Sequence, residues 1–394
     1  MILGAGTFAQ ATFSAVSVGL PALAPALRSH YRLTLGETGV VLGAVGIGML
    51  FTLLPWGLLA DRLDERIVIV VGLAGAGAAL VAAGRTGSYP ALVGVLIAAG
   101  ALGASVNAAS GRAIMSWFHS DQLGLALGIR QTAVPIGGAA AAAGLPWLAS
   151  SGGTRLAFLV LGCGCVGGAL VAGTLMRSSP KRTAPVIANV TGPLGDRRMW
   201  LLGGGAALYL TAQIATTGFI VLFLHEHRGV STHAAAGVLA GVNVLGIGAR
   251  IGAGRWSDRL HARLRPVRQI GLLLAAATAA VAAFVDAPLA VLIPALVVAG
   301  VLSMSWNGLA FAAAAEAAGA SRAGAALGFQ QTLLGVVVAG TPPAFAAIAS
   351  GSWRLAFALS AIGPLLGVLA LRAVAEPRSA GRRPEMSAIP PAAR

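Results

Sequence analysis

Long apolar runs, separated by short charged or proline-containing segments, make up nearly the whole chain. Each run reaches the roughly 20 apolar residues that a helix needs to cross a bilayer, whereas a membrane barrel would show short segments of alternating polarity. The pattern therefore predicts an all-α membrane protein with twelve transmembrane helices. These runs begin near Gly4, Gly36, Ile67, Pro90, Gln122, Arg155, Trp200, His233, Val267, Pro288, Arg322 and Arg354.

The charged turns between the runs show an internal repeat. The segment Gly57-Leu58-Leu59-Ala60-Asp61-Arg62 is echoed by Gly254-Arg255-Trp256-Ser257-Asp258-Arg259, and residues 126–132 return as residues 326–332. A repeat of about half the chain length predicts two six-helix halves with pseudo-symmetry. We assign residues 1–176 to the first half and 199–376 to the second. Residues 177–198 form a charged linker, and residues 377–394 form a disordered tail rich in proline and arginine.

Composition agrees with a membrane location and indicates an orientation. Hydrophobic residues make up 57% of the chain and charged residues only 10%. Most of the 27 lysines and arginines fall in loops on one side, around residues 61–66, 177–198 and 255–268 and after residue 372. Basic loops stay in the cytoplasm, so we expect a multi-pass protein of a bacterial-type inner membrane with both termini cytoplasmic. This placement also argues against a nucleic-acid partner, although the net charge is +15.

The turn after the second run resembles the loop 2-3 signature of the major facilitator superfamily. The matching residues are Gly57-x-Leu59-Ala60-Asp61-Arg62-x-x-x-Arg66, and the departures are Asp64 and Glu65. Residues 254–263 resemble the weaker copy of this signature in loop 8-9. The resemblance covers residues 1–376 and implies a secondary transporter, a symporter or an antiporter, that works by alternating access without a cofactor.

In the fold that this resemblance implies, helices 1, 4, 7 and 10 line a central cavity, with helices 2, 5, 8 and 11 beside them. Polar residues within the apolar runs fall on these helices. Intramembrane polar groups are expensive and commonly functional, so they are candidates for substrate contact. Alternatively, hydroxyls bond to their own helix, and arginines near a helix end reach the headgroups. The candidates are Arg130, Arg112, Gln131, Asn107, Gln10, Tyr209, Gln213, Asn243, Trp306, Asn307, Gln330 and Gln331.

The charges within the predicted helices have one sign. None of the 12 acidic residues falls at mid-membrane, whereas Arg112 and Arg130 lie about 8 to 12 Å inside the cytoplasmic boundary. Buried cations need anions, and the arginine fork suits carboxylates and similar oxyanions. We therefore expect a small-molecule substrate, a small organic or inorganic anion. Trp117-Phe118 and the Gly-x-Ala-Leu-Gly start of helix 5 resemble the cyanate, nitrate and organic-anion branches, although His119 and Leu53 depart from those patterns.

A second set of residues is expected to act in gating. The resemblance implies that Asp61 latches the outward-facing state against the N-terminus of helix 11, where the helix dipole favours negative charge. The alternative is that Asp61 and Arg62 only end the helix and set its topology. Arg250 has three possible partners: Asp258, the helix 5 side of the interface, or the substrate. The gating candidates are Gly57, Asp61, Arg62, Arg66, Arg250, Gly254, Asp258 and Arg259.

Other interpretations of the sequence are less favoured. The segment His225-Glu226-His227 indicates a solvated turn rather than a metal site, because its spacing lies at a loop edge. Gly162-x-Gly164-x-x-Gly167 matches a dinucleotide fingerprint but lies within a continuous apolar helix. Besides the bilayer and the substrate we expect no partner, and a monomer. Two rival functions are an exporter of hydrophobic or drug-like compounds and a transporter-like membrane sensor; no helix carries the residue constellation of an enzyme.

Overall fold

The computed structural model describes residues 2–117, 123–176, 195–319 and 322–376, and within these ranges every regular element is a helix. The first group of helices ends at Leu175 and the second begins at Arg197. The first group contains α1 (Ile2–Ser17), η1 (Leu20–Leu23), α2 (Ala24–Tyr31), α3 (Leu35–Arg62), α4 (Glu65–Ala83), α5 (Tyr89–Trp117) and α6 (Leu123–Leu175). The second contains α8 (Arg197–Gln213), η3 (Ile214–Gly218), α9 (Phe219–Leu222), η4 (Phe223–His227), α10 (Thr232–Leu260), α11 (Leu264–Ala283), α12 (Leu289–Ser305), α13 (Asn307–Ala318), α14 (Ala323–Ala349) and α15 (Trp353–Arg372).

Eleven helical segments of the described chain are long and apolar enough to cross a membrane. One of them, Ile129–Leu175, has 47 residues, about twice what one crossing needs. It is interrupted at Gly152 and Gly153, where Gly153 adopts a φ of 69° that favours glycine. Counting its two parts separately gives twelve crossings, which confirms the predicted all-α fold.

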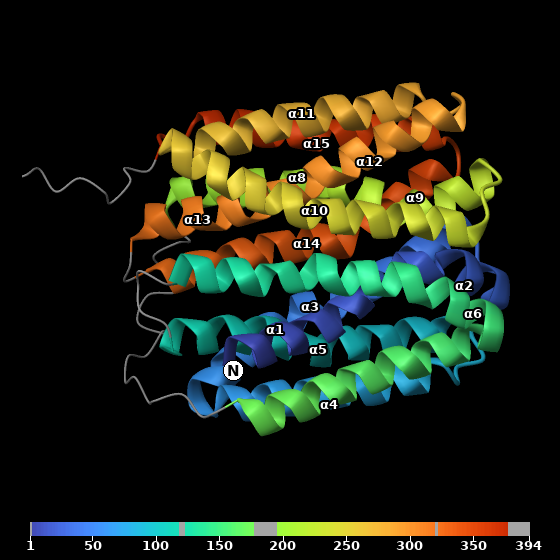
Figure 1. Cartoon of the computed structure of the whole chain (residues 1–394), viewed down its shortest axis with the longest axis horizontal. Coiled ribbons are helices and arrows are strands. Elements are labelled where there is room, and N and C mark those ends of the chain that lie inside the picture. The colour runs from blue at the N-terminus through green and yellow to red at the C-terminus, as the bar shows by residue number, and fades with distance from the viewer. Residues whose placement is uncertain (1, 118–122, 177–194, 320–321, 377–394) are drawn as a thin grey trace, which may run out of the picture.

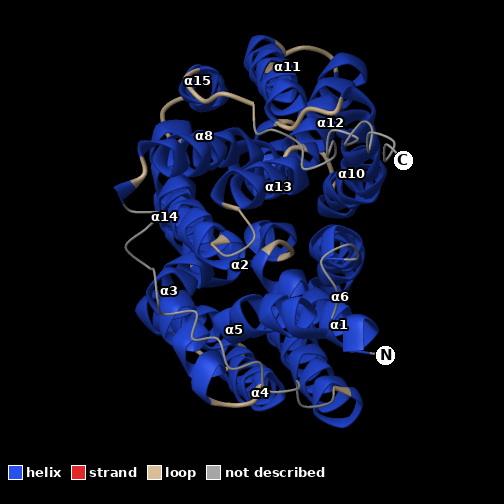
Figure 2. Ribbon diagram, turned by 90° about the vertical axis from the view of Figure 1, so that its left-hand side faces the viewer, coloured by secondary structure: helices blue, strands red, loops and turns tan. Residues whose placement is uncertain are grey.

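The two groups of helices form two bundles that lie side by side. Figure 2 shows α1–α6 in one bundle and α8–α15 in the other, with α3 next to α14 and α6 next to α10 at the seam. We call the first the N half and the second the C half. The loops after α3 and α10 lie at one end of the long axis, and the start of α1 lies toward the same end (Figure 1). We call this the terminal end and the other the opposite end.

Small residues let the helices approach closely within and between the halves. In the N half, a Cβ on Gly48 of α3 would lie 1.9 Å from the carbonyl oxygen of Ile97 on α5. At the seam, a Cβ on Gly39 of α3 would lie 2.7 Å from the carbonyl oxygen of Pro342 on α14. Close backbone approach through small residues is the usual way that helices pack in membranes.

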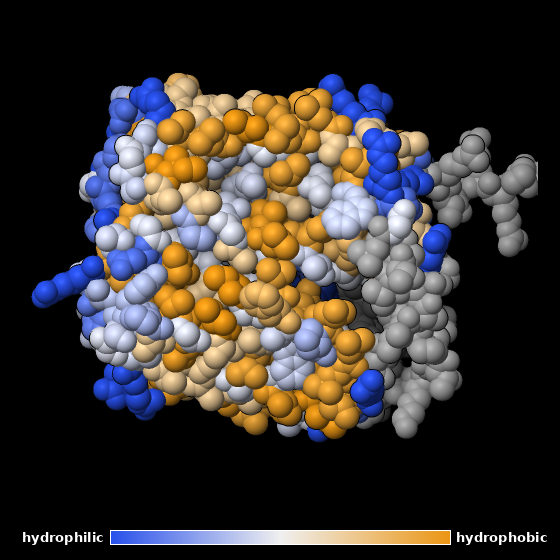
Figure 3. Space-filling model, turned by 180° about the vertical axis from the view of Figure 1, so that it is seen from behind, coloured by the Kyte–Doolittle hydropathy of each residue, from blue (hydrophilic) through white to orange (hydrophobic). Residues whose placement is uncertain are grey.

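The seam between α3 and α14 is closed at the opposite end and parted at the terminal end. Along α3, Gly39, Gly43 and Gly46 lie close to α14, and nearer the terminal end Gly335 of α14 lies close to Leu50 of α3. Leu54, one turn further along α3, is 62% exposed. Figure 3, which shows this face, has a hollow beside the terminal end with hydrophilic atoms inside it. The structure is therefore open toward the terminal end.

Candidate functional site

A cluster of polar side chains joins three helices of the N half. Arg130 of α6 donates from Nε to Ser110 Oγ (2.9 Å) and from Nη2 to the carbonyl oxygen of Asn107 (3.0 Å), both on α5. Gln10 of α1 donates from Nε2 to Asn107 Oδ1 (2.7 Å). Ser110 also donates to the Val106 carbonyl oxygen. The cluster brings together three residues that the sequence analysis selected, Arg130, Asn107 and Gln10.

The local sequence explains why these side chains meet. Asn107 and Ser110 are three residues apart on α5, so they lie on one face of that helix. A Cβ on Gly137 of α6 would lie 2.3 Å from the Ala11 carbonyl oxygen, which shows how closely α1 and α6 pack. Arg130 is only 7% exposed, and its partners in the described structure are neutral. Its positive charge therefore has no carboxylate partner among the described residues.

The C half contains a matching pair of amides. Asn307, at the start of α13, donates from Nδ2 to Gln213 Oε1 of α8 (3.4 Å), as Gln10 and Asn107 are paired in the N half. The repeat positions of Ser110 and Arg130 hold Ala310 and Gln330, so this half lacks the hydroxyl and the cation. Gln330 is 1% exposed, and neither atom of its amide group has a hydrogen-bond partner among the described residues. The shared amide pair is thus supplemented by a cation only in the N half.

Arg250 of α10 connects the two halves. Its Nη1 donates to the carbonyl oxygen of Gln131 on α6 (2.7 Å), and its Nε donates to that of Met304 on α12 (3.1 Å). The Met304 carbonyl is available because the helix is interrupted at Trp306, and the last carbonyls of a helix lack intrahelical partners. Of the partners considered for Arg250, the structure shows the predicted helix 5, which is the first part of α6. Asp258 instead accepts from Arg263 Nη1 (2.5 Å).

The remaining candidates on the central helices have different surroundings. Tyr209 and Trp306 are fully buried and pack edge to face, and the Tyr209 hydroxyl donates to the Val267 carbonyl oxygen (3.1 Å), so neither joins the clusters above. Asn243 is fully buried at the seam, where a Cβ on Gly138 would lie 2.5 Å from its Oδ1. The side chains of Gln131 and Gln331 are half-buried. Arg112 lies in α5, but its side chain is outside the described part of the structure.

The gating candidates other than Arg250 lie at the terminal end. Gly57 in α3 and Gly254 in α10 have open space where a Cβ would be, and Arg62, Arg66 and Arg259 are exposed. Asp61 lies in the last turn of α3, with its side chain outside the described part. Asp64, a departure from the signature, caps α4 by accepting from the Arg66 amide (2.8 Å). In the C half, Arg263 also donates to Glu316 Oε1 (2.9 Å), so it holds two carboxylates there.

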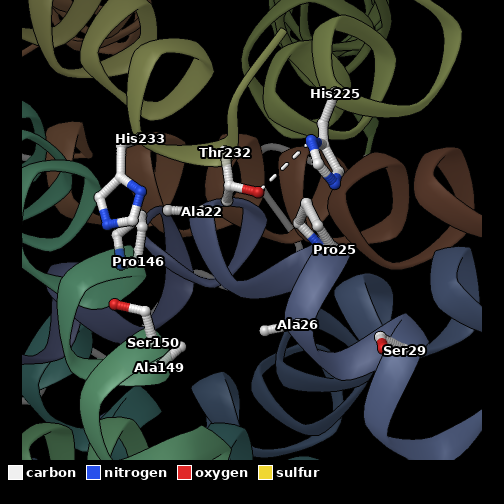
Figure 4. A pocket seen from close by; sticks show the side chains of 10 residues that line it. All are labelled: Ala22, Pro25, Ala26, Ser29, Pro146, Ala149, Ser150, His225, Thr232 and His233. Atoms are coloured by element: carbon white, nitrogen blue, oxygen red, sulfur yellow. Dashed lines mark hydrogen bonds between the residues drawn. The ribbon is translucent and has the colours of Figure 1, made fainter. Parts of the chain in front are cut away.

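At the opposite end, an ion pair joins the two halves. Arg28 of α2 pairs with Glu226 of η4, and both side chains are half-buried. Beside it lies a cavity of about 280 Å³, into which His225 and His233 of the C half project toward Pro25, Ser150 and other N-half residues (Figure 4). His225 Nδ1 contacts the Val230 carbonyl oxygen (2.9 Å). The Arg28–Glu226 ion pair thus joins the two halves at this end.

Two features of the site were missed in the sequence. Ser110, which holds Arg130, was recognisable as the residue one turn after Asn107 on the same helix face. The Arg28–Glu226 pair carried no sequence signal, because two opposite charges 198 positions apart form an ion pair only where the packing of the two halves brings α2 and η4 together.

Neutralising Glu226 is expected to loosen the closed end. Glu226→Gln removes the cross-half ion pair, and for a half-exposed pair we expect a shift of about 0.5 to 1 kcal/mol toward opening, roughly two- to fivefold in population. The alkylation rate of a cysteine introduced at Ala22, a buried residue that lines the adjacent cavity, measures this shift in a background without the native cysteines. The charge-swapped pair Arg28→Glu with Glu226→Arg is the control and should restore slow labelling. Equal labelling in all variants would show that the pair does not hold the seam.

Two six-helix bundles, each with a polar pair inside its membrane-spanning helices, are the architecture of a membrane transporter. The family model of the Major Facilitator Superfamily matches residues 3–342. The chain belongs to this superfamily. It is a multi-pass membrane transporter of small molecules.

Individual relatives agree with this assignment. An uncharacterized MFS-type transporter of Mycobacterium tuberculosis is 34% identical over 355 residues, covering 89% of this chain and 79% of that protein. A probable sulfoacetate transporter of Cupriavidus necator is 27% identical over 394 residues, covering 90% and 88%. Among solved structures, a D-xylose–proton symporter has a TM-score of 0.76 at 16% identity, covering 96% and 98%. A bacterial homolog of the human lysosomal transporter Spinster has a TM-score of 0.74 at 18% identity, covering 94% of each chain.

Proposed function

We propose that this chain moves a small organic or inorganic anion across a bacterial inner membrane by alternating access. The observation that carries the proposal is Arg130, 7% exposed within a membrane-spanning helix and held by neutral partners only. A cation in such a place is costly unless an anion joins it. The planar fork of arginine is suited to a carboxylate, a sulfonate or a similar oxyanion.

The amide groups around Arg130 support a substrate site in the same region. Gln10 with Asn107, and Gln213 with Asn307, place one amide pair in each half. Asn107, Gln213 and Asn307 are only half-buried, so their amides are within reach of a solute between the halves. The similarity to a protein named as a probable sulfoacetate transporter agrees with an anion. We propose that these amides orient the substrate while Arg130 neutralises it.

The asymmetry of the seam supports a conformational assignment. If the basic loops mark the cytoplasmic side, the terminal end faces the cytoplasm and this structure is the inward-facing state. Arg28 and Glu226 then belong to the closed outer gate. The signature residues around Asp61 and Asp258 belong to the parted inner gate, which closes when the halves rock about the midplane site.

A ligand panel on the wild-type protein tests the proposed substrate class. We expect small anions such as acetate, lactate, sulfoacetate, nitrate or phosphate to raise the thermal midpoint in detergent, whereas neutral amides of the same size leave it unchanged. A ligand at 100 times its Kd stabilises the folded state by about 2.7 kcal/mol. The stabilising anion should also accumulate in proteoliposomes. If only hydrophobic compounds or cations stabilise the protein, it is an exporter of the rival class and not an anion transporter.

A further inference from the structure

Two cations, one from each half, meet the same turn of α6. Arg130 extends from this turn, and Arg250 donates to the carbonyl oxygen of Gln131, the next residue (2.7 Å). The partners of both guanidinium groups in the described structure are backbone carbonyls or a hydroxyl, which carry no charge. The described ion pairs involve neither arginine. No carboxylate of the described structure therefore compensates either of these two charges, which lie beside the proposed substrate site.

The halves obtain these charges from different places. Gln330 stands at the position that repeats Arg130, so the C half has no cation at that place. In the C half, the cation is Arg250, which comes from another helix, α10. The helix interruption at Trp306 leaves the Met304 carbonyl oxygen free to accept a hydrogen bond from Arg250 and so to orient it. Arg130 in the N half and Arg250 in the C half therefore place a guanidinium on each side of the seam. A single monovalent anion would balance only one of these two charges.

We propose that the substrate is a dianion, such as a short dicarboxylate, with one acidic group for Arg130 and the other for Arg250. This inference rests on the proposed anion transport and specifies its substrate class. Binding then balances both cations and ties the two halves together at the same level of the membrane. A monoanion of the same shape leaves the charge of Arg250 uncompensated, so the site discriminates by charge number and not only by size.

The test compares each dicarboxylate with its own monomethyl ester, which keeps the carbon skeleton and removes one charge. Malonate, succinate and glutarate and their monomethyl esters are titrated against the full-length protein in detergent at neutral pH. Losing one charge-assisted hydrogen-bonded contact should weaken binding about tenfold to a hundredfold. In Arg250→Gln this preference for the diacid should disappear, whereas in Arg250→Lys, which keeps the charge, it should persist at lower affinity.

Each outcome separates the dianion from the general anion proposal. If a diacid and its ester bind wild type equally and both weaken in Arg130→Gln, the substrate is a monoanion and the dianion inference is wrong. If Arg250→Gln lowers the thermal midpoint and weakens diacid and ester by the same factor, Arg250 is a structural strut between α6 and α12, which also overturns the inference. If neither class of ligand depends on Arg130, the proposed function itself fails. The wild-type comparison decides the question even if Arg250→Gln does not fold.

Discussion

Replacing Arg130 by glutamine is expected to abolish most anion binding while the protein still folds. The substitution removes the guanidinium that the α5 groups orient and restores the residue found at the repeat position, Gln330. A lost charged hydrogen bond corresponds to about 1 to 3 kcal/mol, or roughly five- to 150-fold in Kd. Ser110 keeps its bond to the Val106 carbonyl oxygen, so the cluster is not left unsatisfied. Arg130→Lys retains the charge without the fork and should lose less.

The measurement is ligand-induced thermal stabilisation, followed by uptake into proteoliposomes. Arg85→Gln is the matched control, because Arg85 is exposed at the opposite end and makes one long contact, to the Val81 carbonyl oxygen (3.4 Å). It should bind as the wild type does. Unchanged affinity in Arg130→Gln for every anion that the wild type binds would mean that Arg130 reaches toward the headgroups and has no part in the site.

Adding a single methyl group at Gly48 is expected to disrupt the N half. A Cβ there would lie 1.9 Å from the Ile97 carbonyl oxygen and 2.6 Å from the Ala101 nitrogen, so α3 and α5 must move apart. That movement also weakens the bonds that Thr52 Oγ1 and Trp56 Nε1 donate to the Ala101 carbonyl oxygen, each 2.7 Å. Overpacking costs about 1 to 3 kcal/mol, and each lost hydrogen bond about 1 kcal/mol more. We expect Gly48→Ala to lower the thermal midpoint sharply or to prevent a monodisperse preparation.

The control is a second glycine-to-alanine substitution in α3, at Gly57. Gly57 has no atom within 4 Å of the position that a Cβ would occupy, so Gly57→Ala adds no clash in this state. Alanine also favours a helix over glycine by about 1 kcal/mol. Gly57→Ala should therefore be as stable as the wild type or slightly more stable. Equal midpoints for the two variants would contradict the close packing of α3 on α5.

Helix positions were largely predictable from the sequence. Predicted starts near Gly36, His233 and Arg354 compare with observed starts at Leu35, Thr232 and Trp353. The bilayer forces each crossing to satisfy its backbone within one helix, so apolar run length alone identifies the crossings. Interruptions within a crossing were not predicted. The structure shows such interruptions at Trp306, between α12 and α13, and in the π-helical turns after Gln213.

The polar cluster was predictable only in part. Arg130, Asn107 and Gln10 were selected because polar residues in apolar runs are rare, and the structure brings them together. The same rule also selected Tyr209, whose hydroxyl instead bonds to the Val267 carbonyl oxygen within the C half. Depth along a helix follows from residue number, but the direction in which a side chain points depends on how the helix is rotated in its bundle. The repeat positions therefore predicted the depth at which polar residues lie in the membrane, but not which side chains contact one another there.

By itself, the sequence determined the class of protein, the twelve crossings and the division into two halves. These properties follow from run length, charge placement and repetition, which are local or periodic features of the chain. Only the tertiary structure decided that Arg250 donates to Gln131, that Arg28 pairs with Glu226, and that the seam is open toward the terminal end. Each of these depends on contacts between helices far apart in the chain. Such contacts are set by the mutual packing of the two bundles, for which apolar periodicity carries no information.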